Sequence, residues 1–389
     1  MIRNRRLPPL IKWAGGKGRE LPLLLPLFPR DCRYYLEPFV GGGAVYLAVD
    51  ADKMWVNDRS PELMALYSHL QKDPRPLMNG LGEIWERWEL LGDLVDSNSR
   101  ELIELKEGSS NRKKVVGFLQ PLIQDLLAEL WLWPEAIETG EEYPGEQLQR
   151  ALMESLTRKL QRMVALEQKK GPLPPVDYLK NIESALKGAY YNHLRFLYNH
   201  CSAFWLTPIF RLTLFYFLRE FCYSSMFRYN KDGHFNVPYG GISYNRRDFK
   251  KKIAALEDPE LRCHLQKTHF SCTDFAHFLD QVNPGPADFI FLDPPYDSDF
   301  STYAGNPFGG EDQERLARIL YDIEARFLLV IKNSALIRAL YRNRGFWMAS
   351  FAKNYLVSFQ NRNDKKTRHL LIANFQPEIN RESESLELL

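Results

Sequence analysis

The chain has 389 residues, of which 45% are hydrophobic and 26% charged, and its formal net charge is +2. No apolar stretch approaches the roughly 20 residues that span a bilayer, so we expect a soluble protein without membrane insertion. The basic N-terminus lacks the apolar core and cleavage site of a secretory signal, which predicts a cytoplasmic location. The five scattered cysteines form no C-x-x-C pair and are expected to be reduced.

The first 70 residues alternate strand and helix patterns, as a β/α unit does. Asp58 closes the second strand, and Ser60 with Pro61 supplies an N-cap and a first turn for the helix that follows. This arrangement is half of a doubly wound nucleotide-binding fold. The expected elements are a strand at 33–39, a tight glycine loop at 40–43, the start of a helix at 44–51, a strand at 53–58 and a helix at 60–70.

From about residue 71 to residue 206 the sequence is rich in Leu, Glu, Lys, Arg and Gln, with apolar residues at helical spacing. We expect a mostly helical insertion with mobile joints. His193 and His200 lie seven apart within it, with Cys201 adjacent, but no further ligands cluster at zinc-like spacing. These histidines are therefore interpreted as helix-surface or core residues, and no metal is predicted.

The remaining chain begins with a buried aromatic helix, continues through a Gly- and Asn-rich hairpin and ends in four strand patterns and a polar tail. The expected elements are the helix at 209–227, the hairpin at 228–245, the strands at 267–275, 287–293, 326–333 and 368–375, and the loose tail at 376–389. We expect a catalytic domain in two parts, 1–70 and 249–376. Between them, 71–248 is expected to be a helical insertion and target-recognition region, with a DNA-contacting hairpin at about 206–245. Residues 377–389 are expected to form a flexible tail.

The segment "EPFVGGGAVYLA" places a short glycine loop between a strand and a helix, where backbone amides can approach a nucleotide closely. Tyr46 stands where the dinucleotide fingerprint needs its third glycine, which argues against a bound pyrophosphate. Asp58, 15 residues after Gly43, is placed to bind two ribose hydroxyls of a nucleoside. The alternative is that Asp58 only caps the next helix.

The segment "LIKWAGGKGREL" contains Gly-Gly-Lys but is not a phosphate loop, because Gly18 replaces the Ser or Thr that would hold magnesium. Lys17 and Trp13 can instead bind a carboxylate and an adenine face. On this segment alone, a plain loop is the alternative.

The segment "ADFIFLDPPY" ends an apolar strand on Asp293, Pro294, Pro295 and Tyr296. The two prolines stiffen the chain, and the carboxyl end of a parallel strand faces the crevice where open α/β sheets bind ligands. The Asp293 carboxylate and the Pro294 carbonyl can accept both N–H groups of an amine on an aromatic ring and free its lone pair. Tyr296 can stack on that ring, as aromatic side chains do on flipped bases. A Pro-Pro turn capped by Asp is the alternative.

In this order, "KWAGGK", "EPFVGGGAVYL", "NDRSPELMALY", "FRYNKDGHFNVPYG" and "FIFLDPPY" resemble the Dam-type, alpha-group DNA adenine-N6 methyltransferases over about two-thirds of the chain. The resemblance implies a Rossmann-like α/β sheet with helices on both faces, a mostly helical target-recognition lobe, and S-adenosylmethionine as cofactor. It implies that Asp293 to Tyr296 form the amine-activating motif. It also implies the cofactor-binding residues Trp13, Lys17, Glu37, Phe39, Gly41, Gly43, Asp58 and Asp293.

In the same family, "RYNKDGHFNVPYG" resembles the hairpin that contacts DNA, where Arg228 would read a base or a phosphate. The alternative is an arginine that closes the hairpin. Ser224 and Ser225 stand where GATC-reading members carry Asn-Gly, which leaves the recognition sequence open. The stretch 71–206 is expected to be largely without a counterpart in short members. The implied DNA-binding residues are Lys12, Tyr223, Ser224, Arg228, Asn230, Asn236 and Tyr239.

The leading hypothesis is a methyltransferase that acts on N6 of adenine in double-stranded DNA after base flipping. One alternative is methylation of another amine, in cytosine, RNA or a protein glutamine; Asp293 disfavours the cytosine-N4 and glutamine enzymes, which usually carry Ser and Asn at this position. The other alternative is an inactive DNA-binding subunit. A restriction or defence-system partner and the oligomeric state are left open by the sequence.

Overall fold

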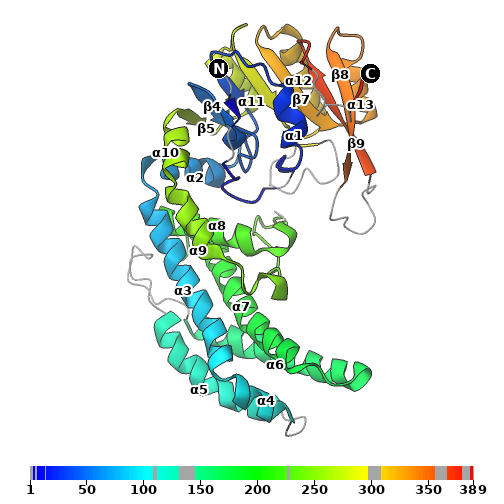
Figure 1. Cartoon of the computed structure of the whole chain (residues 1–389). Helices are drawn as coiled ribbons and strands as arrows, with labels where there is room; N and C mark the ends of the chain where they lie inside the picture. Colours follow the sequence, from blue (N-terminus) through cyan, green and yellow to red (C-terminus); the bar gives the residue numbers. More distant parts are fainter. Residues whose placement is uncertain are drawn as a thin grey trace. The chain divides into compact units, whose positions relative to one another are not determined.

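The protein is described by a computed structural model that covers residues 3–4, 7–13, 15–107, 112–130, 145–225, 228–296, 308–354, 366–378 and 386–388. The chain divides into two compact units (Figure 1). We call them the sheet unit and the helical unit. The sheet unit comprises Met1–Asp73, Phe227–Gly233 and Asp258–Leu389, and the helical unit comprises Pro74–Met226 and His234–Glu257.

The sheet unit is built on an eight-stranded sheet with the strand order β10-β8-β9-β7-β6-β2-β4-β5. Five strands, from β7 to β5, run parallel, while β9, β8 and β10 continue the sheet in antiparallel pairs. The chain adds β4 and β5 on one side of β2 and then β6 and β7 on the other, which makes the space between β2 and β6 a topological switch point. The strands are β2 (Tyr35–Glu37), β4 (Met54–Asn57), β5 (Thr268–Ser271), β6 (Phe289–Leu292), β7 (Arg326–Lys332), β8 (Trp347–Asn354), β9 (Lys366–Ala373) and β10 (Glu387–Leu388).

Both faces of this sheet are buried, as the apolar strand β6 requires. Ile290 and Leu292 join a core with residues of α11, α12 and α13, whereas Phe289 and Phe291 contact Phe28 on the opposite face. Figure 1 labels these helices in the sheet unit. The predicted α/β sheet with helices on both faces is confirmed. Helices and turns of this unit are α1 (Leu21–Leu24), η1 (Leu25–Leu27), α2 (Pro61–Lys72), α10 (Pro259–Gln266), α11 (Phe275–Val282), α12 (Gly310–Asp322) and α13 (Ala335–Tyr341).

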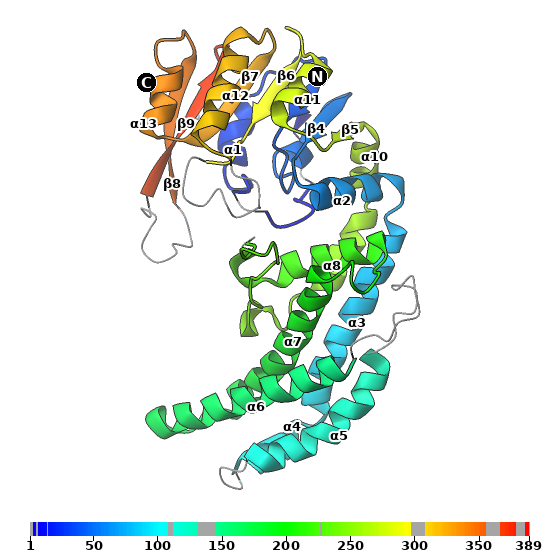
Figure 2. The same ribbon diagram turned by 180° about the vertical axis from the view of Figure 1, so that it is seen from behind.

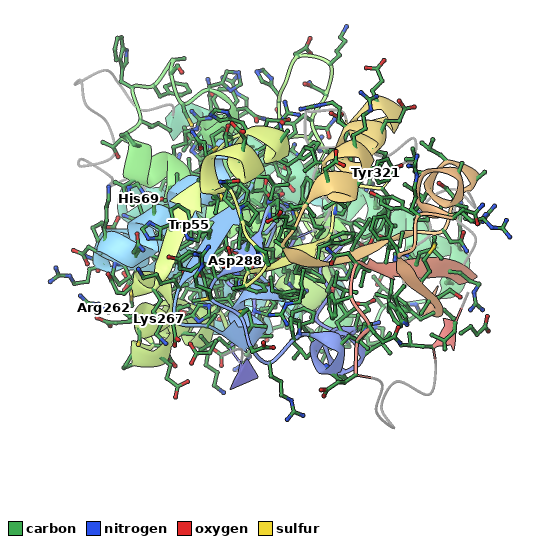
Figure 3. All side chains as sticks on the ribbon, turned by 90° about the horizontal axis from the view of Figure 1, so that it is seen from above. Trp55, His69, Arg262, Lys267, Asp288 and Tyr321 are labelled. Carbon is green, nitrogen blue, oxygen red and sulfur yellow. The ribbon has the colours of Figure 1, made fainter. Side chains whose placement is uncertain are left out.

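The amino-terminal ends of β2 and β6 are joined by an ion pair. Arg33 donates to both oxygens of the buried Asp288, at 2.9 and 2.7 Å. Figure 3 looks down on the molecule and shows Asp288 at the centre of the sheet unit, between Trp55 and Tyr321. This pair lies at the end of the strands opposite to their carboxyl termini, so it supports the sheet without taking part in the crevice there.

The six predicted strands and the helix at 60–70 are confirmed, and Ser60 Oγ accepts the N–H of Leu63 at the start of α2. The predicted helix start at 44–51 is wrong. The chain forms only the 3-10 turn η2 (Tyr46–Ala48), because Val49 is extended (φ −109°, ψ 150°) and begins β3 (Val49–Asp50), which pairs with β1 (Arg3–Asn4).

The end of the chain also differs from the sequence expectation. The predicted loose tail contains β10, which pairs with β8. Strand β8, which lies between β9 and β10, was not predicted. Both strands belong to the antiparallel part of the sheet, in which β8 pairs with β9, the next strand along the chain, and with β10 near its end.

The helical unit confirms the predicted helical content of the insertion and the buried aromatic helix. Trp88 of α3 is fully buried and contacts the rings of Phe217 and Phe221 on α8 and of Tyr190 on α7. Figure 2 shows α6 running beside α7. The helices are α3 (Arg75–Ser97), α4 (Ser99–Glu107), α5 (Arg112–Leu130), α6 (Gly145–Lys170), α7 (Pro175–Asn199), α8 (Pro208–Phe221) and α9 (Phe249–Ala254).

The predicted hairpin at 228–245 is a loop with a tight turn. Asn230 Oδ1 accepts the N–H of Asp232, and the carbonyl of Asn230 accepts the N–H of Gly233. All residues of 228–245 are described, and none of them belongs to a strand. Tyr239 forms an isolated bridge with Cys222. The side-chain bond of Asn230 competes with strand pairing at this point.

Across the described helices, none is long and apolar enough to cross a membrane.

Candidate active site

The glycine loop follows β2 and lies at the switch point. It is tied to β4, because the N–H of Val40 bonds to the carbonyl of Asn57 and the N–H of Gly41 to Asp58 Oδ2 (3.0 Å). Gly43 has φ +74°, and a Cβ there would lie 2.5 Å from the hydroxyl oxygen of Tyr67. Glycine is needed at this position both for its backbone angle and for the close approach of α2.

Trp13 packs directly on this loop. A Cβ at Gly41 would lie 2.8 Å from Trp13 Cδ1, and one at Gly42 would lie 2.9 Å from Trp13 Cβ and 2.5 Å from the carbonyl oxygen of Ile11. The segment with Ile11 and Trp13 is therefore in contact with the glycine loop, which allows both to contribute to one site.

The carboxylate of Asp58 is held by two backbone N–H groups. Gly41 donates to Oδ2 and Ser60 donates to Oδ1, each at 3.0 Å. Asp58 thus links the loop to the start of α2, and its side chain is partly exposed.

Asp293 follows the carboxyl end of β6 and is paired with Lys17. The ammonium of Lys17 lies 2.5 Å from each oxygen of Asp293 and also donates to the Tyr296 hydroxyl (2.8 Å) and the Gly15 carbonyl (3.0 Å). The side chain of Lys17 is 2% exposed and that of Asp293 is 19% exposed. A charge pair this sheltered interacts more strongly than one in water, so Lys17 restrains the carboxylate.

The residues after Asp293 are also fixed in place. The amide of Gln313, fully buried on α12, donates to the Pro295 carbonyl at 3.0 Å. The ring of Tyr296 meets that of His369 edge to face, with centroids 5.0 Å apart. The motif is therefore braced from α12 and from β9.

Glu37 and Phe39 flank the start of the loop. Glu37 is buried and accepts the Tyr35 hydroxyl at 2.6 Å, and burial raises the pKa of its carboxyl well above the usual range. The ring of Phe39 packs against Phe275 and Phe308, with centroids 5.5 and 5.7 Å apart. The structure thus brings the residues predicted for cofactor binding together at the carboxyl ends of β2, β4 and β6.

Two residues that support this site were missed by the sequence reasoning. The Asn57 amide donates to the Pro38 and Thr273 carbonyls, and its oxygen accepts the Thr273 N–H, which joins the ends of β2, β4 and β5. Gln313 is the second. Asn57 could have been found, because it is a polar residue at the end of an otherwise apolar strand. Nothing in the sequence marked Gln313, which lies 18 residues beyond Pro295.

The residues predicted to bind DNA are spread over both units. Arg228 and Asn230 are exposed, Tyr223 is 44% exposed, and Lys12 and Asn236 are partly exposed. Ser224 has φ +53°, which marks a sharp turn after α8.

Tyr239 differs from these residues, because its ring packs inside the helical unit. The ring contacts Trp88 and Tyr191, and its hydroxyl donates to Asn245 Oδ1 (2.9 Å). Burial raises the pKa of this tyrosine. Its DNA-binding role stays a prediction.

The histidines of the helical unit lie in different surroundings. His193 is buried, and burial lowers its pKa to about 4, so the ring is neutral at physiological pH. His200 is partly exposed, and its Nδ1 lies 2.8 Å from the Phe196 carbonyl. Within the described ranges, no group of three or more His, Cys, Asp or Glu residues could hold a metal ion.

Comparisons with known proteins agree with this geometry. The model of the D12 class N6 adenine-specific DNA methyltransferase family matches residues 13–113 and 168–358, well over half of the chain. The unmatched stretch, 114–167, is much shorter than the 71–206 expected to lack a counterpart, so that expectation is corrected. The helices α3, α4 and α7 lie within the matched residues.

Among the similar proteins is the Type II methyltransferase M.CviBI of Paramecium bursaria Chlorella virus NC1A, 25% identical over 95% of this chain and 100% of the relative. The Retron Ec67 DNA adenine methylase of Escherichia coli is 35% identical over 40% of this chain and 52% of the relative. A DNA adenine methylase of Vibrio cholerae serotype O1 is 22% identical over 79% of this chain and 74% of the relative. The chain therefore belongs to the D12 class N6 adenine-specific DNA methyltransferases.

Proposed function

We propose that this enzyme transfers a methyl group from S-adenosylmethionine to N6 of adenine in double-stranded DNA. One observation carries the proposal. Asp293 stands at the carboxyl end of β6, next to the glycine loop of β2, at the switch point where open α/β sheets bind ligands. The family gives the target atom and the class of substrate.

The residues around the loop fit a nucleoside cofactor. The Asp58 carboxylate is partly exposed beside the loop, where an acid at a strand end can bind ribose hydroxyls, and Gly41 to Gly43 have no side chains of their own to keep a ligand from the backbone. Bound S-adenosylmethionine would supply an activated methyl group. We assign its binding to Trp13, Lys17, Glu37, Phe39, Gly41, Gly43, Asp58 and Asp293.

The motif from Asp293 to Tyr296 is assigned to the target base. An adenine flipped out of the duplex would donate its two N6 hydrogens to the Asp293 carboxylate and the Pro294 carbonyl, while Tyr296 stacks on its ring. These bonds would localise the lone pair of the nitrogen so that it can accept the methyl group that the bound cofactor supplies. The carbon–sulfur bond of the cofactor would break, S-adenosylhomocysteine would leave, and one N6 proton would be released. Positioning of the two reactants supplies much of the rate.

DNA contact is assigned to the exposed residues of both units and to the loop after α8. Arg228 is the candidate reader of a guanine or a phosphate, since its side chain is exposed next to the turn at Asn230. The proposed set is Lys12, Tyr223, Ser224, Arg228, Asn230, Asn236 and Tyr239.

The test uses the full chain expressed in a host without DNA methylation. Single-molecule sequencing of the host DNA is expected to show N6-methyladenine in one sequence context, and purified enzyme is expected to transfer tritium from labelled cofactor to unmethylated DNA. N4-methylcytosine in place of N6-methyladenine would overturn the choice of base. Cofactor-independent DNA binding with no transfer would overturn the proposed activity.

Gln313 gives a prediction about the motif itself. Gln313→Leu keeps the volume but removes the donor to the Pro295 carbonyl. Loss of one such bond is worth about 1.4 kcal/mol, so we expect kcat to fall about tenfold with little change in cofactor affinity. Single-turnover kinetics and calorimetry measure the two quantities.

Gln71→Leu is the matched control. Gln71 also donates its amide to backbone carbonyls of the sheet unit, those of Leu265 and Thr268. Thr268 begins the edge strand β5, which lies three strands from β6 and its Asp293. Both variants should lose stability, and only Gln313→Leu should lose kcat. Equal effects on kcat would show that Gln313 contributes to folding alone.

A further inference from the structure

The stretch outside the family match contains most of α6, and one face of this helix is basic. Arg158, Arg162 and Lys169 are exposed and lie four and seven residues apart, which places them within about 40° of each other around the helix. We call these three residues the α6 basic stripe. They extend over about 16 Å of helix length.

The opposite side of α6 fixes the helix to its neighbour, so the stripe has a rigid support. Leu152, Leu156 and Met163 are buried on that opposite side, and beside the stripe Ser155 Oγ donates to the Ala185 carbonyl of α7 at 2.8 Å. The stripe is presented by a packed helix and not by a loop, which lowers the entropic cost of binding through it.

The charges of the stripe are not neutralised within the described part of the chain. No ion pair joins these three residues to a described acid, whereas other exposed arginines, such as Arg100 and Arg318, are paired with glutamates one turn away. The acid nearest the end of α6, Glu167, lies on the other side of the helix and accepts the N–H of Leu173 at 2.8 Å. The exposed acid Glu154 lies one turn before Arg158, but no ion pair joins the two, and three like charges in line favour an anionic partner.

We propose that the α6 basic stripe binds the phosphate backbone of duplex DNA outside the recognition sequence. A strand offers one phosphate per about 3.4 Å of duplex rise, so a stripe of this length can meet several phosphates. Arg158 and Arg162 lie outside the residues that the family model matches and Lys169 lies just inside them, so the stripe would lengthen the DNA footprint of this enzyme at the edge of the part shared with its family. The inference rests on the proposed action on double-stranded DNA.

The experiment compares the wild type with the triple variant Arg158→Gln, Arg162→Gln, Lys169→Gln. Each lost phosphate contact lowers the slope of log K against log salt by about 0.9, so we expect a slope smaller by about 2 to 3 and unchanged kcat at saturating DNA. The difference should vanish on duplexes trimmed close to the methylated adenine and return as flanking DNA is added.

A second triple variant, Lys72→Gln, Arg100→Gln, Arg318→Gln, removes the same net charge from exposed positions elsewhere and should leave the slope nearly unchanged. Equal slopes for the stripe variant and the wild type would overturn the inference. An equal decrease of the slope in both triple variants would also overturn it, because that result would report net charge alone. Wild-type protein that methylates no DNA would instead overturn the proposed function, which separates the two failures.

Discussion

Asp293→Asn is expected to lower the rate of methyl transfer about 10²- to 10³-fold while binding of S-adenosylmethionine largely survives. The substitution keeps the size of the side chain but replaces one acceptor oxygen with an N–H₂ group, which repels the N6 hydrogens of the target adenine. Removing one well-placed polar group from a reacting centre costs a factor of this size. The rate is measured with tritiated cofactor on unmethylated DNA, and cofactor binding is measured by calorimetry.

The buried ammonium of Lys17 makes a control necessary. In Asp293→Asn, the Lys17 ammonium loses the carboxylate that lies 2.5 Å away. Because the side chain of Lys17 is only 2% exposed, this unpaired buried charge is expected to lower the free energy of unfolding. The double variant Asp293→Asn, Lys17→Met removes both charges and should recover stability without recovering activity. Full activity in Asp293→Asn would contradict the proposed mechanism, and activity that returns with stability in the double variant would show that Asp293 acts on the fold.

The strands that carry the site were predictable from the sequence because each is a short apolar run that ends at a polar residue. The run before Asp293 is buried on both faces, so it could only be a central strand. The structure of the segment after the glycine loop was not predictable in the same way. Apolar residues 44–49 suit a helix or a strand equally, and pairing of Val49 with Asn4, far from it in sequence, decides the outcome.

The candidate site shows the same division between local and distant information. Chain position alone suggested that Asp58 and Asp293 lie at strand ends. The pairing of Asp293 with Lys17, 276 residues apart, could not be read from spacing, and neither could the contact of Gln313 with Pro295. Sequence reasoning assigned Lys17 to the cofactor, and the structure adds a protein carboxylate as its immediate partner.

This pairing leads to a prediction that separates two roles of Lys17. If the ammonium mainly restrains Asp293, Lys17→Met should lower kcat about tenfold to a hundredfold with a small change in the dissociation constant of S-adenosylmethionine. If it mainly holds the cofactor, the dissociation constant should rise and kcat at saturating cofactor should stay. Although Lys17 is also assigned to the cofactor site, we expect the first result, because both oxygens of Asp293 and the Tyr296 hydroxyl lie within 2.8 Å of the ammonium. Calorimetry and single-turnover rates give the two numbers.

Lys53→Met, on the exposed surface of the same unit, is the control for loss of a lysine and should behave as the wild type. Coupling between Lys17 and Asp293 gives the decisive comparison. Residues that act as a unit are strongly non-additive, so Asp293→Asn should cost much less in a Lys17→Met background than in the wild type. Additive losses would show that the 2.5 Å contact contributes nothing to the reaction and that Lys17 and Asp293 serve different ligands.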